Sequence, residues 1–138
     1  MLALDVGDAR IGLASGVVGS LLAFGRGALV RRGTRSDVPA VMALLAEEGA
    51  EVVVVGLPLR LSGEESAQTE RVRRFAKALA AAGARVEFED ERLTTRLAQR
   101  QVSGGGLPMT RRREKGLLDE GAAVLILESY LRRVGGPT

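Results

Sequence analysis

The chain has 138 residues, of which 46% are hydrophobic and 27% charged, a balance typical of one globular domain with a substantial core. It contains no cysteine and no histidine, which excludes disulfides, thiolate chemistry and the commonest zinc ligand. We expect no signal peptide, because the first predicted strand starts at residue 1 or 2, and no apolar run reaches the roughly 20 residues that a membrane span needs. We therefore expect a single cytoplasmic domain over residues 1–138 with no membrane partner.

The first part of the chain predicts three strands. Residues 2–6 are apolar and form the first strand, and a tight turn at 7–9 leads into a second strand over 10–15. A third strand is predicted over residues 21–30, where two glycines interrupt the pattern. The three strands together predict an antiparallel start to a sheet.

Two helix–strand units follow. Ser36 or Asp37 is predicted to cap a helix that ends near Gly49. The four valines at 52–55 are typical of a parallel strand that is buried on both faces.

A capping-box pattern then marks the start of the second helix. Ser62 and Glu65 have the spacing of such a box, and the helix is predicted to end near Gly83. The alternating residues 85–89 predict the fifth strand.

The last part of the chain predicts two helices separated by a glycine-rich hinge. A short basic helix runs from Thr94 or Thr95 to about residue 102, and the hinge covers residues 103–108. A helix that is apolar nearly all round spans about 114–133. The order of elements predicts an α/β fold, with a mixed five-stranded sheet and helices on both faces.

Acidic residues stand at the ends of several predicted elements. Asp5 lies near the end of the first strand, Asp90 and Glu91 follow the fifth strand, and Asp119 opens the apolar part of the last helix. Carboxylates that converge from such positions are hard oxygen ligands for Mg²⁺ or Mn²⁺. Two such ions supply an activated water and charge neutralisation for phosphodiester hydrolysis without a histidine base.

Each acid also has a purely structural interpretation. Asp5 could pair with Arg10 or shape the turn, and Asp90 or Glu91 could cap a helix. Asp119 could simply favour a helix dipole. Adjacent strand residues point to opposite faces, so only one of Asp90 and Glu91 is expected to reach a common site.

The net charge of +3 is unevenly distributed. Residues 92–115 hold seven basic side chains and one acidic, a net charge of +6, whereas the rest has 13 basic and 16 acidic, a net charge of −3. A local basic segment suits contact with a polyanion, although a solvated loop would show the same charge run. The candidate nucleic-acid contacts are Arg10 in the hairpin and Arg92, Arg96, Arg100, Arg111, Arg112, Arg113 and Lys115.

The low content of aromatic residues bears on the type of nucleic acid that the chain would recognise. Aromatic residues make up 3% of the chain, so base stacking is poorly supported and recognition of a structured duplex or junction is favoured. Gln68, Arg71 and Arg74 on the second helix could extend the basic surface, but a solvated helix face is the preferred interpretation.

Several motifs together resemble the YqgF family, also called RuvX, over almost the whole length. These small bacterial proteins are described as pre-16S rRNA nucleases and as Holliday junction resolvase-like. The matching stretches are residues 4–7 with 10–12, 54–58 with 72–76, 90–95, and 115–127.

The resemblance implies a ribonuclease H-like fold and a divalent-metal nuclease that matures the 5′ end of 16S rRNA. Asp5 resembles the first-strand carboxylate, Glu91 the strand-end acid and Asp119 the helix-borne acid, which makes these three the predicted catalytic and metal-binding residues with Mg²⁺ or Mn²⁺. The implied partners are structured RNA or branched DNA and ribosomal precursor particles, with a monomer or homodimer as the acting species. Asp8, the segment after Ser15 and Gly121 depart from the family pattern.

Two other classes of function compete with this one. A non-catalytic rRNA-binding factor would keep the basic segment but would not need the three acids. An actin-like phosphotransferase shares the Asp-x-Gly hairpin, but it needs a duplicated domain to enclose ATP, and 138 residues supply one.

Overall fold

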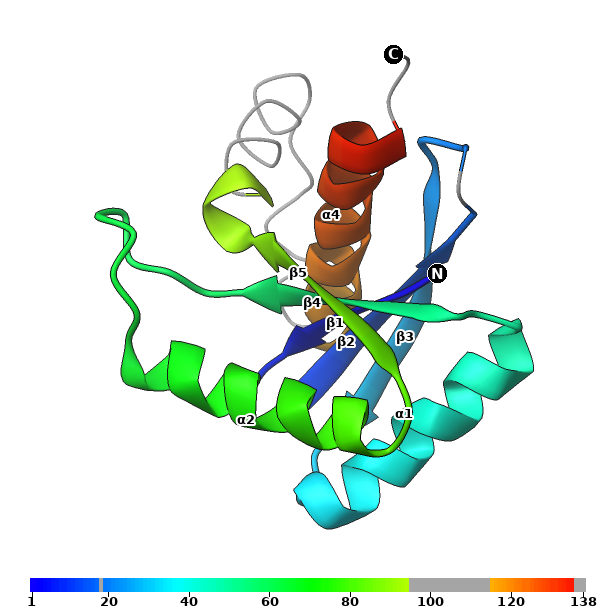
Figure 1. The fold of residues 1–138 in the computed structure, drawn as a ribbon, viewed down its shortest axis with the longest axis horizontal. Coiled ribbons are helices and arrows are strands. Elements are labelled where there is room, and N and C mark those ends of the chain that lie inside the picture. Colours follow the sequence, from blue (N-terminus) through cyan, green and yellow to red (C-terminus); the bar gives the residue numbers. More distant parts are fainter. Residues whose placement is uncertain (18, 95–114, 136–138) are drawn as a thin grey trace.

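The computed structural model describes residues 1–17, 19–94 and 115–135, and the side chains of 115–117 and 135 are not described. The described residues form a five-stranded sheet with helices on both faces, as Figure 1 shows. This confirms the predicted fold class. The strands are β1 (Leu2–Val6), β2 (Arg10–Gly16), β3 (Ala23–Val30), β4 (Val52–Leu57) and β5 (Arg85–Asp90).

The sheet has the order β3-β2-β1-β4-β5. The hairpin strands β1 and β2 pair antiparallel, with Asp5 opposite Gly12, and β3 extends the same antiparallel meander. Strands β4 and β5 run parallel to β1, as the buried valine run predicted. The carboxyl ends of β1, β4 and β5 therefore lie at one edge of the sheet, where open α/β sheets bind ligands.

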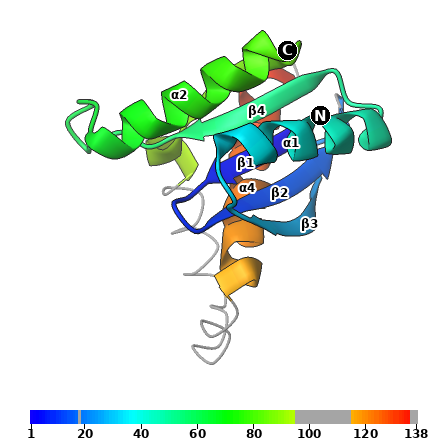
Figure 2. The same ribbon diagram turned by 90° about the horizontal axis from the view of Figure 1, so that it is seen from below.

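Helices α1 (Thr34–Glu48) and α2 (Ala67–Ala81) cover one face of the sheet, and α4 (Lys115–Gly135) covers the other (Figure 2). Side chains alternate across β1: Leu4 packs with the cluster under α1 and α2, whereas Ala3 packs against α4. Asp5 has the parity of Ala3, which places its carboxylate on the α4 face.

Two predicted helix starts are wrong by a few residues. Helix α1 begins at Thr34, so Asp37 lies in its first turn and not at its cap. The carboxylate of Asp37 accepts hydrogen bonds from the backbone N–H groups of Arg32 and Gly33, which precede the helix. The capping box of α2 is Ser66 with Thr69, four residues after the predicted one.

Other boundaries differ less. Strand β3 starts at Ala23, two residues later than expected, and β4 and β5 extend further than predicted, to Leu57 and Asp90. Among the described residues helix α4 covers Lys115–Gly135, close to the predicted span of about 114–133, and Asp119 lies at least one turn inside it.

The predicted basic helix beyond residue 94 and the hinge at 103–108 lie outside the described residues. The candidate contacts Arg96, Arg100, Arg111, Arg112 and Arg113 lie there too, and the side chain of Lys115 is not described. Within the described part of the chain, no helix is long and apolar enough to cross a membrane.

Candidate active site

Asp5 and Glu91 form the centre of the candidate site. Asp5 is the fourth residue of β1, and Glu91 follows β5 at the start of a helical turn over 91–94. The two carboxyl groups share a hydrogen bond, which Glu91 donates as the protonated partner. The ends of two strands that are 86 positions apart in sequence therefore meet, although β4 lies between β1 and β5 in the sheet.

Burial of this acidic pair shifts both pKa values upward. Loss of solvent raises the pKa of Asp5, the hydrogen bond from Glu91 opposes this, and the negative charge of Asp119 adds to the rise. Burial also raises the pKa of Glu91 to about 8, with further contributions from the charge and hydrogen bond of Asp5 and from the charge of Asp90. The pair therefore holds a proton at neutral pH, a state that suits replacement of the proton by a cation.

Asp119 reaches the same edge because α4 passes very close to β2. A Cβ atom added at Gly12 would lie 1.9 Å from the carbonyl oxygen of Asp119, so only glycine permits this approach. Gly12 stands directly opposite Asp5 in the sheet register. The glycine thus brings the helix-borne acid to the strand-borne acid.

The carboxylate of Asp119 is bound by Arg10 in this structure. Arg10 Nε donates to Asp119 Oδ2 over 2.7 Å, and both side chains are 28% exposed. The sequence suggested Asp5 as the structural partner of Arg10, and the structure instead pairs Arg10 with Asp119. Arg10 lies at the carboxylate site, although no described contact tests its predicted role with phosphate.

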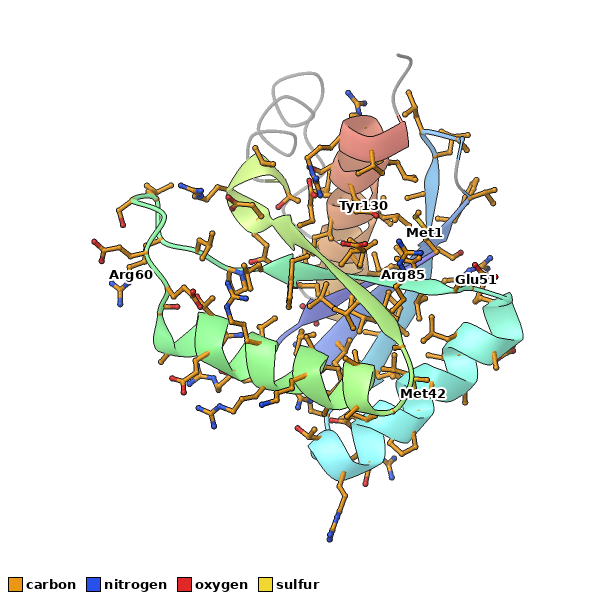
Figure 3. All side chains as sticks on the ribbon, in the orientation of Figure 1. Met1, Met42, Glu51, Arg60, Arg85 and Tyr130 are labelled. Carbon is orange, nitrogen blue, oxygen red and sulfur yellow. The ribbon has the colours of Figure 1, made fainter. Side chains whose placement is uncertain are left out.

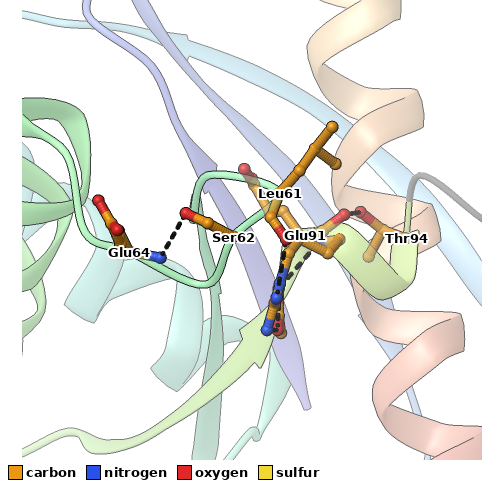
Figure 4. A network of polar contacts seen from close by, with 7 residues as sticks. Leu61, Ser62, Glu64, Glu91 and Thr94 are labelled. Carbon is orange, nitrogen blue, oxygen red and sulfur yellow. Dashed lines mark hydrogen bonds and ion pairs between the residues drawn. The ribbon is translucent and has the colours of Figure 1, made fainter.

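Asp90 has a different role from its neighbour Glu91. The carboxylate of Asp90 accepts a hydrogen bond from the backbone N–H of Arg92 at 2.9 Å and forms an ion pair with the guanidinium of Arg92 at 2.7 Å. Arg92 also donates to the carbonyl of Leu61, and Thr94 donates to the carbonyl of Glu91 (Figure 4). Asp90 and Arg92 together fix the turn that presents Glu91.

The donor set suits a hard divalent cation in its chemistry. Three carboxylates and no nitrogen or sulfur ligand match the preference of Mg²⁺ or Mn²⁺ for oxygen. Within the described ranges no group of three acidic side chains is arranged to hold a metal ion, and Asp119 is instead bound to Arg10. Two of the three predicted ligands meet, and the third lies near enough for its charge to raise the pKa of Asp5.

Two supporting features escaped the sequence analysis. Gly56 of β4 leaves room for the site, because a Cβ there would lie 2.9 Å from Glu91 Oε1 and 2.4 Å from the Cδ1 of Ile126. The fully buried Glu89 accepts hydrogen bonds from Ser129 Oγ and from the guanidinium of Arg133.

This second contact ties β5 to the last turns of α4. Arg133 lies 5.4 Å from the ring centroid of Tyr130, the α4 side chain labelled in Figure 3. The alternating pattern of β5 places Glu89 on the face opposite to Val86 and Phe88, so no signal in the sequence indicates that Glu89 is buried.

Comparisons with known proteins fit this geometry. Residues 1–133 match the family model described as "RuvX: Holliday junction resolvase". The chain belongs to the RuvX family. A RuvX relative from Thermus thermophilus, "Putative pre-16S rRNA nuclease", is 52% identical over 95% of this chain and 96% of the relative. "Ribonuclease YqgF" from Deinococcus radiodurans is 43% identical over 96% of this chain and 88% of the relative.

Solved structures with the same fold include two resolvases. Thermus thermophilus RuvC in complex with a Holliday junction substrate superimposes with a TM-score of 0.58 at 19% identity, covering 96% of both chains. The fowlpox virus resolvase bound to Holliday junction DNA has a TM-score of 0.52 at 12% identity, covering 97% of this chain and 99% of the other. This likeness confirms the predicted ribonuclease H-like fold.

Membership of the RuvX family also confirms the predicted class of enzyme, a nuclease that hydrolyses phosphodiesters in nucleic acid. Nucleases of this fold class generally use divalent metal ions.

Proposed function

We propose that this RuvX protein is a divalent-metal-dependent nuclease that processes the 5′ end of pre-16S rRNA during ribosome biogenesis. One observation carries the proposal: the carboxyl groups of Asp5 and Glu91 meet at the carboxyl edge of the sheet, with Asp119 close enough to raise the pKa of Asp5. The name of the Thermus thermophilus relative supports rRNA as the substrate, and that of the Deinococcus radiodurans relative supports RNA. The enzyme would act in the cytoplasm on rRNA or on ribosomal precursor particles, as a monomer or homodimer.

Asp5, Glu91 and Asp119 would hold Mg²⁺ or Mn²⁺. The bound ion would supply an activated water and neutralise negative charge that develops on the phosphate oxygens. To act as ligands, Glu91 would give up the proton that it shares with Asp5, and Asp119 would release the guanidinium of Arg10. The preference for Glu91 over Asp90 rests on the engagement of Asp90 by Arg92.

Arg10 would then be released next to the reacting phosphate. A guanidinium there can donate two parallel hydrogen bonds to phosphate oxygens. Arg92 and the basic residues up to Lys115 would add contacts to the backbone of the strand, which position a substrate without reading its sequence.

Two alternative functions can be distinguished from this one by the same experiment. The family description and the fold of RuvC favour a Holliday junction resolvase that acts on branched DNA, which requires the same carboxylates. A non-catalytic rRNA-binding factor would bind RNA and cut nothing.

The test is cleavage of a pre-16S rRNA fragment and of a four-way DNA junction, side by side, with Mg²⁺, Mn²⁺ or EDTA. The variants are Asp5→Asn and, as a control at an exposed acid just before β4, at the opposite end of the sheet, Glu51→Gln. We expect metal-dependent cutting of the RNA by the wild type and by Glu51→Gln, and none by Asp5→Asn.

The other outcomes assign the other functions. Cutting of the junction alone would make the protein a resolvase. Salt-sensitive binding without cutting of either substrate, in both metals, would make it a binding factor. Cutting that persists in EDTA or in Asp5→Asn would remove the proposed metal site.

A further inference from the structure

A cleft of about 420 Å³ lies on the face of the sheet opposite to the carboxylates, beneath the β1–β2 turn. Its lining includes Gly7 and Asp8 of the turn and three arginines, Arg31, Arg71 and Arg74. The volume falls in the range of small-ligand sites. The turn follows Asp5 by two to three residues, so about 7–10 Å of extended chain separate the cleft from the carboxylates.

Arg31 is the fixed wall of this cleft. Its Nε lies 2.7 Å from the buried carboxylate of Asp37, and its Nη1 donates to the carbonyl of Gly7 at 3.0 Å. The guanidinium also stacks over the ring of Phe75 at 5.0 Å. These contacts from three elements hold one cationic group at the base of the turn without the entropy cost of ordering a free side chain.

Arg71 and Arg74 line the cleft from α2, and each forms an exposed ion pair that a ligand could replace. Arg71 Nη2 donates to Gln68 Oε1 at 2.7 Å, which orients the guanidinium toward the turn, and its Nε lies 3.4 Å from Asp8 Oδ1. Arg71 is 51% and Asp8 74% exposed, so their ion pair contributes little stability. Arg74 forms a similarly exposed pair with Glu70 at 3.2 Å.

The cleft resembles an anion-binding site in which the carboxylate of Asp8 stands where the anion would bind. Three guanidinium groups line the cleft, and Asp8 is the one acid among the lining residues. A phosphate has more acceptor oxygens than a carboxylate and binds guanidinium forks in two-pronged geometry. It would therefore displace Asp8 from Arg71 at small cost. The sequence favoured a solvated helix face for Gln68, Arg71 and Arg74, because the chain alone does not show that the turn folds over them.

We propose that the cleft beneath the β1–β2 turn binds a phosphate group of the nucleic-acid strand. When no phosphate is bound, the carboxylate of Asp8 forms the ion pair with Arg71 instead. The site extends the proposed nuclease function, on which it rests, because a strand that crosses the end of β1 meets the carboxylates on one face and the cleft on the other. Asp8 and Arg71 then set the affinity of the protein for its substrate in opposite directions.

The test measures binding of a labelled RNA hairpin with a single-stranded extension by fluorescence anisotropy, in EDTA, from 50 to 300 mM KCl. Arg71→Gln should weaken binding roughly three- to tenfold at low salt and reduce the salt slope by about 1. Asp8→Asn should strengthen binding by a similar factor. The matched control is Arg85→Gln, because Arg85 is exposed and begins β5 at the other end of the sheet (Figure 3).

Two results would overturn the proposal. One is an equal loss of affinity in Arg71→Gln and Arg85→Gln, which would reduce the effect to overall charge. The other is no gain in Asp8→Asn together with no loss in Arg71→Gln. Since the two variants have opposite expected signs, a folding defect in either cannot imitate the predicted pattern.

A second arm separates the sources of the phosphate group. Inorganic phosphate and adenosine 5′-monophosphate are titrated into ¹⁵N-labelled wild type, and the amide shifts of Gly7 and Gly33 are followed. Binding of the mononucleotide that Arg71→Gln abolishes, with RNA affinity unchanged, would overturn the proposal for the nucleic-acid strand and assign the cleft to a free nucleotide. Cleavage is not measured in either arm, so a protein that binds through this cleft but cuts nothing would overturn the nuclease proposal alone.

Discussion

Arg10 and Asp119 join the first hairpin to α4 through an ion pair of 2.7 Å. The guanidinium of Arg10 therefore binds one of the three carboxylates that are predicted to bind metal. The pair is partly exposed and contributes at most about 1 kcal/mol to stability. Asp119 could therefore exchange Arg10 for a metal ion with little loss of stability.

Arg10→Gln should increase the affinity for Mn²⁺ about three- to tenfold, because Asp119 loses its competing partner. Cleavage should slow in the same variant, because glutamine lacks the guanidinium that we propose contacts the phosphate. Isothermal titration of Mn²⁺ in the absence of nucleic acid measures the first effect. Arg26→Gln is the control, since Arg26 pairs with Glu48. Weaker or unchanged Mn²⁺ binding in Arg10→Gln would show that the ion pair does not compete with the metal.

Metal binding should also depend on pH through Glu91. The pKa of Glu91 is raised to about 8 without metal, so at lower pH the group is protonated and must lose its proton to become a ligand. We expect the affinity for Mn²⁺ to rise up to about tenfold per pH unit between pH 6.5 and 8, and to level off above. Calorimetry in buffers of different ionisation enthalpy should count nearly one released proton at pH 7. Glu91→Gln should release none, and release of a full proton by this variant would contradict the assignment.

Stability of the metal-free protein should fall as pH rises. The folded-state pKa of Glu91 is raised above its usual value of 4.5, so its contribution is fully present below pH 4.5 and is lost toward pH 8. Glu91→Gln does not titrate and should be more stable than the wild type at pH 8 by roughly 1–3 kcal/mol in EDTA. Denaturant unfolding at pH 5 and pH 8 measures this, and a difference that does not grow with pH would argue against the protonated pair.

Two glycines near α4 should respond in opposite ways to alanine. A Cβ at Gly12 would overlap the carbonyl of Asp119, so Gly12→Ala should displace α4 and cost at least about 2 kcal/mol. A Cβ at Gly121 meets nothing within 4 Å, and alanine is the better helix former by about 1 kcal/mol. Gly121→Ala should thus raise the melting temperature while keeping cleavage. Equal effects of the two substitutions on the melting temperature would show that α4 does not approach β2 as closely as described.

Asp37 should control stability in acid. Burial would raise the pKa of Asp37, but the hydrogen bond and charge of Arg31 and the N–H groups of Arg32 and Gly33 outweigh it and lower the pKa. A lowered folded-state pKa contributes stability above the usual value of 3.8 that is lost as pH falls through the folded-state value. Asp37→Asn should cost about 2–4 kcal/mol at pH 7, because the side chain is 5% exposed and Arg31 loses its partner.

The difference between Asp37→Asn and the wild type should shrink below pH 4, where the wild-type carboxylate also takes up a proton. Thermal unfolding at pH 7 and pH 3 measures the change. Asp8→Asn, at an exposed position, should leave stability unchanged at both pH values. A constant difference across this range would show that the charge of Asp37 is not what stabilises the fold.

The strands and the three acids were predictable because local pattern determines them. The valine run at 52–55 identifies a parallel strand, and the carboxyl ends of parallel strands lie at one edge of a sheet. Glu91 could therefore be expected at the same edge as Asp5, although β4 lies between their strands. The helix starts were less predictable. Ser62 with Glu65 and Ser66 with Thr69 both resemble a capping box, and the β-bridge between Leu59 and Glu65 keeps the first of them extended.

Close approach between distant segments could not be predicted from the sequence. Gly12 has an ordinary place in a glycine-containing hairpin, and its need for a missing Cβ arises only from the path of α4 more than a hundred residues later. The pairing of Arg10 with Asp119 and the folding of the turn over Arg71 have the same origin. Each depends on how two elements cross, which no local periodicity encodes.

The position of β1 in the middle of the sheet has a consequence for the order in which the protein is made. The first strand to leave the ribosome pairs on one side with β2 at once, but its other neighbour, β4, follows only after residue 51. Helix α4, which carries Asp119, is synthesised last of the described elements. An incomplete nascent chain therefore exposes the apolar α4 face of its sheet and lacks Asp119, so the proposed nuclease site cannot assemble before translation has passed Asp119.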